Sequence, residues 1–231
     1  MGSKLTLIPM DIETTGLAVD DEVTVIGFVL PMGARVFLQT DNRQAGADRL
    51  EDRMLHRFGD QLDHLEVTVH ESEQTLLAAV ETFAAERLSP RDYLLTAYNG
   101  DVFRGGFDLP FLRTRYARLD ASWPFVDLPY ADLLPVVQNR FNTTVDGDGS
   151  NDLERAYDVL VGGDLTAADP FESSGSAVTA FTDGEFEALL AHNVADILRT
   201  ERLAAVAERF CSKSEFKMKS LTPTALDPAL K

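Results

Sequence analysis

Three short segments near the start of the chain have the apolar content of β-strands. They are Leu5–Glu13, Val23–Leu30 and Ala34–Gln39, and only Pro31-Met32-Gly33 separates the last two. Val, Ile, Leu and Phe dominate them, and connections this short join antiparallel neighbours. The pattern predicts an antiparallel meander of three strands.

After residue 70 the apolar spacing becomes helical. Ser72–Leu88 has an apolar stripe, a serine that can cap its first turn and a Ser-Pro pair after its end. Tyr93–Tyr98 is predicted to be a further strand, followed by a loop at Asn99–Gly106. Residues 41–70 are polar and ambiguous, with at most a short helix around Asp48–Phe58.

The second half of the chain is predicted to be mainly helical. Helices are expected at Leu109–Leu119, Asp152–Val161 and Glu185–Phe210, a short edge strand at Val126–Tyr130, and loops at 142–150 and 164–182. Residues 1–211 are predicted to form a single α/β domain and residues 212–231 a flexible tail. Several α/β folds share this order of elements.

Composition narrows the class of protein. The chain has 231 residues, of which 45% are hydrophobic, enough for one substantial core. No segment approaches the roughly 18–20 apolar residues that span a bilayer, and no basic segment followed by an apolar one indicates a signal peptide. A single cysteine, Cys211, excludes an internal disulfide framework and fits a reducing interior. We therefore expect a cytoplasmic protein without a membrane partner.

The charge balance is strongly acidic. Asp and Glu number 38 against 21 Lys and Arg, the net charge is −17, and no lysine occurs between Lys4 and Lys213. Such a charge keeps a protein soluble, and its self-repulsion is screened at high salt, where the Debye length is about 3 Å at 1 M. The composition is typical of a halophilic, haloarchaeal protein.

Asp11 and Glu13 are the first candidate metal ligands. They lie two residues apart in a predicted strand, so their side chains point to the same face. Two buried carboxylates on one face repel each other and are costly to desolvate unless a cation such as Mg²⁺ lies between them. The alternative, a solvated acidic strand end before a turn, is the better reading of an isolated Asp-x-Glu.

Two later groups supply further acids. Asp108 lies within Phe107-Asp108-Leu109-Pro110-Phe111-Leu112, at the start of a predicted helix, where an anion is favoured. His192 and Asp196 are four residues apart and share one face of the last helix. Read alone, Asp108 is a helix cap, and the second pair is a solvent-exposed support for the helix.

Together these motifs resemble the DEDD exonucleases, the DnaQ-like branch of the ribonuclease H-like superfamily. Residues 11–17, residues 99–100 with 107–112, and His192 with Asp196 match its three motifs in order. The short His–Asp spacing and the preceding Asp169-Pro170-Phe171 are similar to the YprB-like branch. The resemblance implies a mixed five-stranded sheet, an antiparallel meander plus parallel strands, flanked by helices.

The resemblance also implies an activity, a 3′–5′ exonuclease acting on single-stranded DNA or RNA. Asp11, Glu13, Asp108 and Asp196 would hold two Mg²⁺ or Mn²⁺ ions, and His192 would be the general base. Substrate contacts are expected from Thr14, Thr15, Gly16, Asn99, Arg104 and Phe107. Phosphate contacts are expected from Arg104, Arg113, Arg115 and Arg118. An endonuclease and a non-catalytic binding module on the same fold remain alternatives, and no protein partner is indicated.

Overall fold

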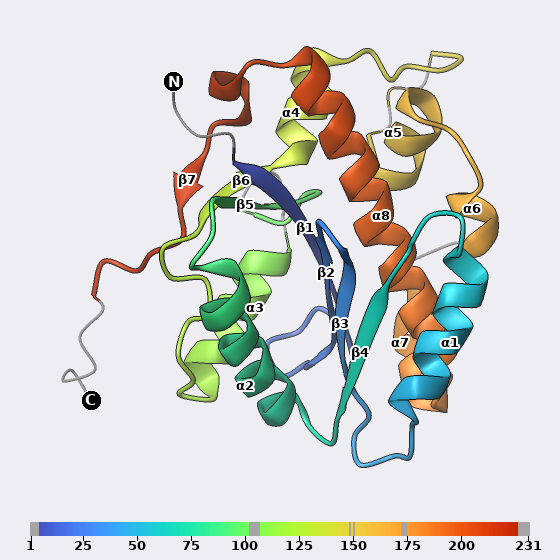
Figure 1. Ribbon diagram of the computed structural model, residues 1–231, viewed down its shortest axis with the longest axis vertical. Helices are drawn as coiled ribbons and strands as arrows, with labels where there is room; N and C mark the ends of the chain where they lie inside the picture. The colour runs from blue at the N-terminus through green and yellow to red at the C-terminus, as the bar shows by residue number, and fades with distance from the viewer. Residues whose placement is uncertain (1–4, 102–106, 148, 150, 172–174, 226–231) are drawn as a thin grey trace.

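A mixed β-sheet lies at the centre of the computed structural model, which describes residues 5–101, 107–147, 149, 151–171 and 175–225 (Figure 1). The strand order is β4-β3-β2-β1-β5-β6-β7. The strands are β1 (Thr6–Thr14), β2 (Val23–Leu30), β3 (Gly33–Gln39), β4 (Leu65–His70), β5 (Tyr93–Ala97), β6 (Pro129–Asp132) and β7 (Lys219–Ser220). The α/β class and the mixed sheet are as predicted.

Strands β1, β2 and β3 form the predicted antiparallel meander. Ile12 pairs with Ile26, which in turn pairs with Phe37. Seven of the eight residues of β2 are buried because this central strand is covered on both faces. The meander places the end of β1, with Asp11 and Glu13, in the middle of the sheet.

The other half of the sheet begins with parallel pairing. β5 runs parallel to β1, and β6 runs parallel to β5. β6 begins at Pro129, a few residues later than the expected strand at Val126–Tyr130. Its last residue, Asp132, accepts a hydrogen bond from Leu134 N and so caps the helix that follows.

The expectation of five strands is wrong, because the described residues form a sheet of seven. β4 pairs parallel with β3 at one edge, and β7 pairs antiparallel with β6 at the other. β4 shows the alternation of a strand, with Leu65 and Val67 buried and Glu66 exposed, within a segment that looked merely polar. β7 has only two residues, both exposed, so its pairing has no local signal.

Helices cover both faces of this sheet. They are α1 (Ala47–Phe58), α2 (Glu73–Phe83), α3 (Asp108–Arg118), α4 (Leu133–Arg140), α5 (Leu153–Leu160), α6 (Leu165–Ala168), α7 (Gly175–Asp183) and α8 (Phe186–Phe210). α2 begins with the predicted cap at Ser72, and a π-helical turn at Ala84–Leu88 continues it. None of the helices in the described ranges is long and apolar enough to cross a membrane.

The loop expected at 164–182 is instead largely helical. It contains α6 and α7, and α4 is a further helix that was not expected. In α7 the buried residues Ala177, Ala180 and Phe181 follow helical spacing, but two of the three are small. Small apolar residues give a weak periodic signal, which explains why this helix was missed.

The two faces of the sheet have separate cores. α2 and α3 pack on one face, where Met10 and Ile12 of β1 are buried. α1, α7 and α8 pack on the other face (Figure 1). In the first half of α8, Leu189–Ala195 is buried throughout because the helix lies between the sheet and α5.

The segment after Cys211 differs from the flexible tail that was expected. Lys213–Phe216 forms a 3₁₀ helix, and β7 follows it. Trp123 Nε1 donates a hydrogen bond of 3.0 Å to Leu221 O, and both Phe216 and Leu221 are buried. Residues 213–222 therefore belong to the folded structure, whereas 226–231 lie outside the described residues.

Candidate metal-binding site

A pocket of about 420 Å³ brings together the four predicted acids and the predicted histidine. Asp11 and Glu13 come from β1, Asp108 from α3, and His192 and Asp196 from α8. Gly175 and Val178 of α7 complete one wall. Residues separated by up to 185 positions in the sequence thus converge on one site.

Asp11 and Glu13 share one face of β1, as their spacing predicted. Met10 and Ile12 point into the core on the opposite face, so the two carboxylates face α8. Asn193 of α8 donates a hydrogen bond of 3.0 Å to Asp11 Oδ2. Because Glu13 is only 7% exposed, the reading of a solvated strand end does not hold.

Gly27 allows α8 to approach the sheet this closely. It pairs with Asp11 across β1 and β2. A Cβ atom at Gly27 would lie 2.1 Å from Asn193 Oδ1 and 3.2 Å from the side chain of Ile197. The absence of a side chain at this position therefore places Asn193 against Asp11.

Asp108 is the first residue of α3, and its side chain is only 7% exposed. It does not cap its helix, because the N-cap is Phe107 and no side chain makes a capping hydrogen bond. Gly100 packs beside it: a Cβ atom there would lie 3.0 Å from Asp108 Oδ2. The carboxylate of Asp108 therefore lines the pocket and does not form a capping hydrogen bond with its own helix.

Burial and mutual repulsion raise the pKa values of the four acids. Burial, followed by the charges of Glu13 and Asp108, raises the pKa of Asp11 well above its usual range. Burial and the charge of Asp196 do the same to the pKa of Glu13, and burial also raises the pKa of Asp108 and of Asp196. A bound cation would relieve this repulsion and favour the ionised forms.

His192 lies between two carboxylates. Its Nδ1 atom is 3.0 Å from both oxygens of Asp169, and its Nε2 atom is 3.8 Å from Asp196 Oδ2. Burial would lower the pKa of His192, but the hydrogen bond to Asp169 and the charge of Asp196 outweigh it and raise the pKa to about 9. His192 is 4% exposed, so the reading of a solvent-exposed His–Asp pair is wrong.

Asp169 and Arg199 form a buried support that the sequence analysis did not identify. Arg199 Nη1 donates to Asp169 Oδ2 at 2.7 Å and to Asp196 Oδ1 at 2.5 Å. Neither the Arg199 nor the Asp169 side chain is more than 1% exposed. The signal was an arginine three residues after Asp196, on a helix whose surrounding residues are mostly apolar.

The predicted substrate residues have different positions. Thr14, Gly16 and Phe107 line the pocket. The Thr15 hydroxyl instead donates to Asp21 Oδ1, and Asn99, with a left-handed φ of 62°, forms the turn after β5. Arg104 lies outside the described residues.

The three arginines expected to contact phosphate that lie in the described ranges each have an acidic partner. Arg115 makes a bidentate pair with Glu73 at 2.8 and 2.7 Å, with both side chains buried. Arg118 pairs with Asp20 at 2.7 Å, and Arg113 lies 3.5 Å from Asp101. Arg115 is thus a structural residue, and its assignment to phosphate is wrong.

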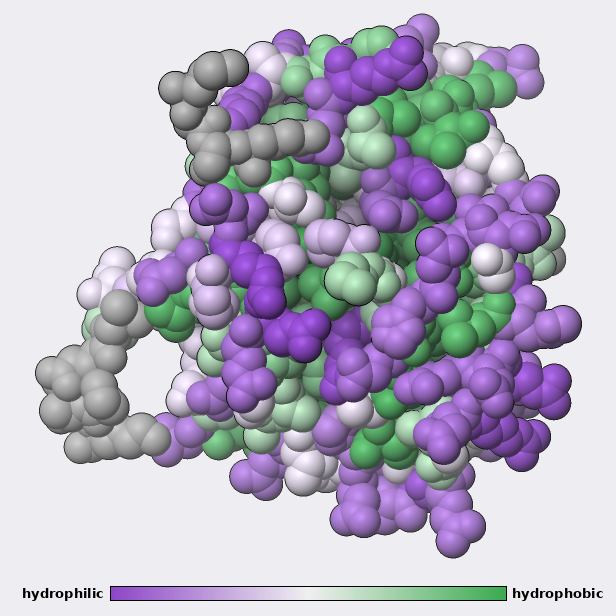
Figure 2. All heavy atoms as spheres, in the orientation of Figure 1, coloured by the Kyte–Doolittle hydropathy of each residue, from purple (hydrophilic) through white to green (hydrophobic). Residues whose placement is uncertain are grey.

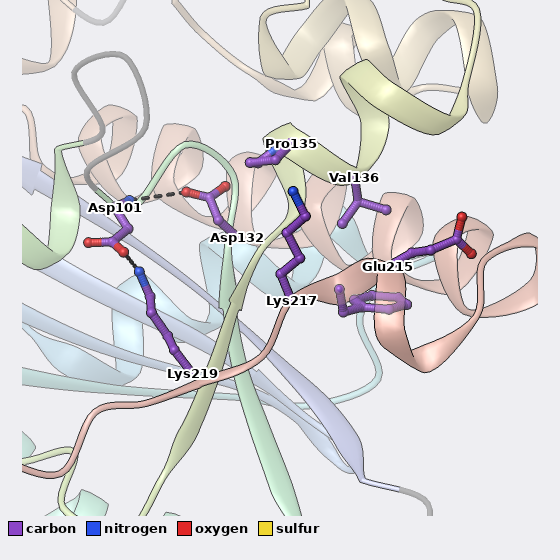
Figure 3. A pocket seen from close by; sticks show the side chains of 8 residues that line it. Asp101, Asp132, Pro135, Val136, Glu215, Lys217 and Lys219 are labelled. Atoms are coloured by element: carbon purple, nitrogen blue, oxygen red, sulfur yellow. Dashed lines mark hydrogen bonds and ion pairs between the residues drawn. The ribbon is translucent and has the colours of Figure 1, made fainter.

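A second pocket of about 350 Å³ lies on the other side of the turn at residues 99–101. Figure 3 shows Lys217 and Lys219 extending into it from the C-terminal segment. Lys219 pairs with Asp101, whose backbone N–H donates to Asp132 Oδ2 at 3.1 Å. These contacts hold Asp101 in place at the turn that follows β5.

No model of a known protein family matches the chain, and a search of curated proteins finds no similar sequence. The donors of the site are carboxylate oxygens and one imidazole, and ligand atoms of Glu13, His192 and Asp196 lie within 4.8 Å of one another. This set of donors fits a divalent metal ion.

Proposed function

We propose that this protein is a metal-dependent nuclease of the DEDD type, with a ribonuclease H-like fold. The observation that carries the proposal is the convergence of Asp11, Glu13, Asp108 and Asp196 on one pocket. Their order in the sequence matches the motif order of that family. The closest resemblance is to its YprB-like branch, with Mg²⁺ or Mn²⁺ as the cofactor.

The donor set supports the binding of such ions. Oxygen ligands are those that Mg²⁺ and Mn²⁺ prefer, and the four acids are held close together although burial raises their pKa values. When bound, two such ions supply an activated water and stabilise the leaving oxygen in phosphodiester cleavage. Asp11, Glu13, Asp108 and Asp196, which all line the pocket, would hold these ions.

Other residues of the pocket would position a nucleic acid. Thr14 and Gly16 lie at the end of β1 beside Glu13, and Phe107 offers an aromatic ring next to Asp108. Bases stack on aromatic rings whatever their sequence. The pocket therefore suits a single-stranded DNA or RNA end, and we infer 3′–5′ exonuclease activity.

The test is metal-dependent cleavage of labelled oligonucleotides. Single-stranded DNA, RNA and duplexes, labelled at the 5′ end, are incubated with the protein in KCl with Mg²⁺ or Mn²⁺. A ladder shortening from the 3′ end is expected, and EDTA should stop it. Asp11→Asn should lose at least about 100-fold in rate, since it removes a charged ligand.

Asp60→Asn is the matched control, because Asp60 is an exposed aspartate outside the pocket. It should cleave like the wild type. Cleavage of a circular single strand would identify an endonuclease instead. Metal binding in calorimetry without any cleavage would favour a non-catalytic binding module, and Asp11→Asn activity equal to wild type would refute the assignment of the site.

A further inference from the structure

The two ring nitrogens of His192 have different surroundings. Nδ1 is held by Asp169, with both oxygens at 3.0 Å. Nε2 lies 3.8 Å from Asp196 Oδ2, and His192 lines the pocket. The His192 side chain is 6% exposed, so Nε2 is held beside the acids of the pocket.

The distance from Nε2 to Asp196 Oδ2, 3.8 Å, is too long for a hydrogen bond, which is about 2.7–3.2 Å. It does fit two ligands of one ion. Ligand atoms that each lie about 2.0–2.2 Å from a metal are at most about 4.4 Å apart. Glu13, His192 and Asp196 each offer a ligand atom, and these three atoms lie within 4.8 Å of one another, so small side-chain adjustments suffice.

Asp169 accepts a hydrogen bond from the ring nitrogen of His192 that would not bind the metal. Histidines that bind metals donate their other N–H to a carboxylate, which fixes the tautomer and orients the ring. Asp169 is itself held by Arg199 Nη1 at 2.7 Å and by Phe171 N at 3.1 Å. This support leaves Nε2 as the nitrogen with a free lone pair when Nδ1 carries the proton.

Arg199 fixes the orientation of the Asp196 carboxylate. It takes Asp196 Oδ1 at 2.5 Å, so Oδ2, the oxygen that faces His192, is the one left for a metal. Glu13, His192 and Asp196 form a three-ligand set with one nitrogen donor, in which Nε2 and Asp196 Oδ2 are the atoms that face each other.

We propose that His192 Nε2 binds a divalent metal ion directly, together with Glu13 and Asp196, and that this position therefore prefers a first-row transition ion such as Co²⁺ or Zn²⁺ to Mg²⁺. Imidazole suits such ions, whereas Mg²⁺ favours oxygen ligands and retains its waters. The inference rests on the metal binding in the proposed function, but not on nucleic-acid cleavage. It replaces the role of general base expected for His192 with that of a ligand.

Co²⁺ is a suitable probe because its visible spectrum reports its ligands. Untagged protein freed of metal with EDTA is titrated with Co²⁺, and the proton NMR spectrum of the complex is recorded. A histidine bound to Co²⁺ through Nε2 gives a strongly shifted, exchangeable Nδ1–H signal. The wild type is expected to show such a signal, and a 100-fold excess of Mg²⁺ should leave the Co²⁺ spectrum in place.

Two variants and a control assign the signal. His192→Gln should abolish it and weaken Co²⁺ binding at least about 10-fold, whereas Asp169→Asn should move it and weaken binding about 10–100-fold. His56→Gln removes an exposed histidine of α1 and should change neither. Thermal melts establish that each variant is folded.

The wild-type spectrum alone can overturn the inference, whether or not a variant folds. Co²⁺ bound without a shifted imidazole signal, or displaced by equimolar Mg²⁺, would show that His192 is not a ligand. Unchanged Co²⁺ affinity in folded His192→Gln would do the same and favour the role of base. A Co²⁺ site with the shifted signal but no nuclease activity would leave the inference standing and overturn the proposed function.

Discussion

The negative charge of Asp108 is expected to destabilise the folded protein when no metal is bound. Burial, and then the charges of Asp132 and Asp196, raise its pKa. A raised pKa means that the contribution of Asp108 to stability is present below the unfolded pKa, about 3.9, and is lost as the pH rises through the folded value. In EDTA at pH 7–8, Asp108→Asn is therefore expected to melt at a higher temperature than the wild type.

The size of this effect should depend on pH. A pKa raised by one unit corresponds to about 1.4 kcal/mol, and the advantage of Asp108→Asn should shrink as the pH falls towards about 4. Thermal melts across this range measure it, with Asp60→Asn as the exposed control expected to be neutral. If Asp108→Asn proved less stable at neutral pH, the carboxylate would be a stabilising group and not a strained metal ligand.

Arg115 is expected to matter for stability and not for substrate. It is buried against Glu73, and removing one partner of such a pair leaves an uncompensated buried charge, costing about 3–5 kcal/mol. Arg115→Met should lower the free energy of unfolding by that amount in urea titrations. Arg118→Met, which breaks the exposed pair with Asp20, should cost less than about 1 kcal/mol. Equal effects of the two would contradict the assignment.

The residues that could be predicted from the sequence are those with a local pattern. Asp11 and Glu13 alternate on a strand, and His192 and Asp196 are one helical turn apart, so their shared faces follow from spacing alone. Asp169 could not be assigned a role in this way. Its function depends on the position of α6 and α7 relative to α8, which is a matter of tertiary packing.

At the scale of elements, the segment after Cys211 is expected to stabilise the fold. It buries Phe216 and Leu221 and adds β7 to the sheet. Each such side chain contributes about 1.5–3 kcal/mol on burial. A chain ending at residue 211 should therefore lose about 3 kcal/mol or more.

The melting temperature reports this loss. For a domain of this size, 1 kcal/mol shifts it by about 2–4 °C, so a fall of roughly 6–12 °C is expected. A chain ending at residue 225 keeps every contact described for the segment and serves as the control. If both truncations melted like the full chain, the segment would not contribute to the stability of the fold.

The elements differ in how far the sequence specified them. The meander, α2 with its cap at Ser72, and α8 have strong periodic patterns and were correctly predicted. β4 was missed although its alternation was present, and α7 was missed because Ala gives little contrast. β7 consists of two exposed residues whose partners in β6 are 89 and 91 positions away, so only the folded structure could reveal it.

For the whole molecule, the net charge of −17 is the dominant feature. Hydrophilic side chains cover most of the face in Figure 2, and apolar ones show mainly in the gaps between them. Phosphate contacts normally dominate affinity for nucleic acid, and an acidic surface opposes them. Binding at the proposed site would therefore rest on metal ions, hydrogen bonds and base stacking.

The same charge predicts that salt stabilises the fold, as proposed for a halophilic protein. The Debye length falls from about 30 Å at 0.01 M to about 3 Å at 1 M, so repulsion among surface carboxylates is largely screened by 1 M KCl. The melting temperature measured in EDTA is expected to rise most steeply over this range. Equal or greater stability in dilute buffer would refute the idea.

The origin of the rise can be tested with Asp108→Asn in the same KCl series. If the surface charge is responsible, this variant should keep most of the increase, because it removes one carboxylate of 38. A rise that disappears in the variant would instead assign the salt effect to the buried acids around Asp108. Since Glu13 and Asp108 are buried, screening by bulk ions should affect them less than the exposed surface.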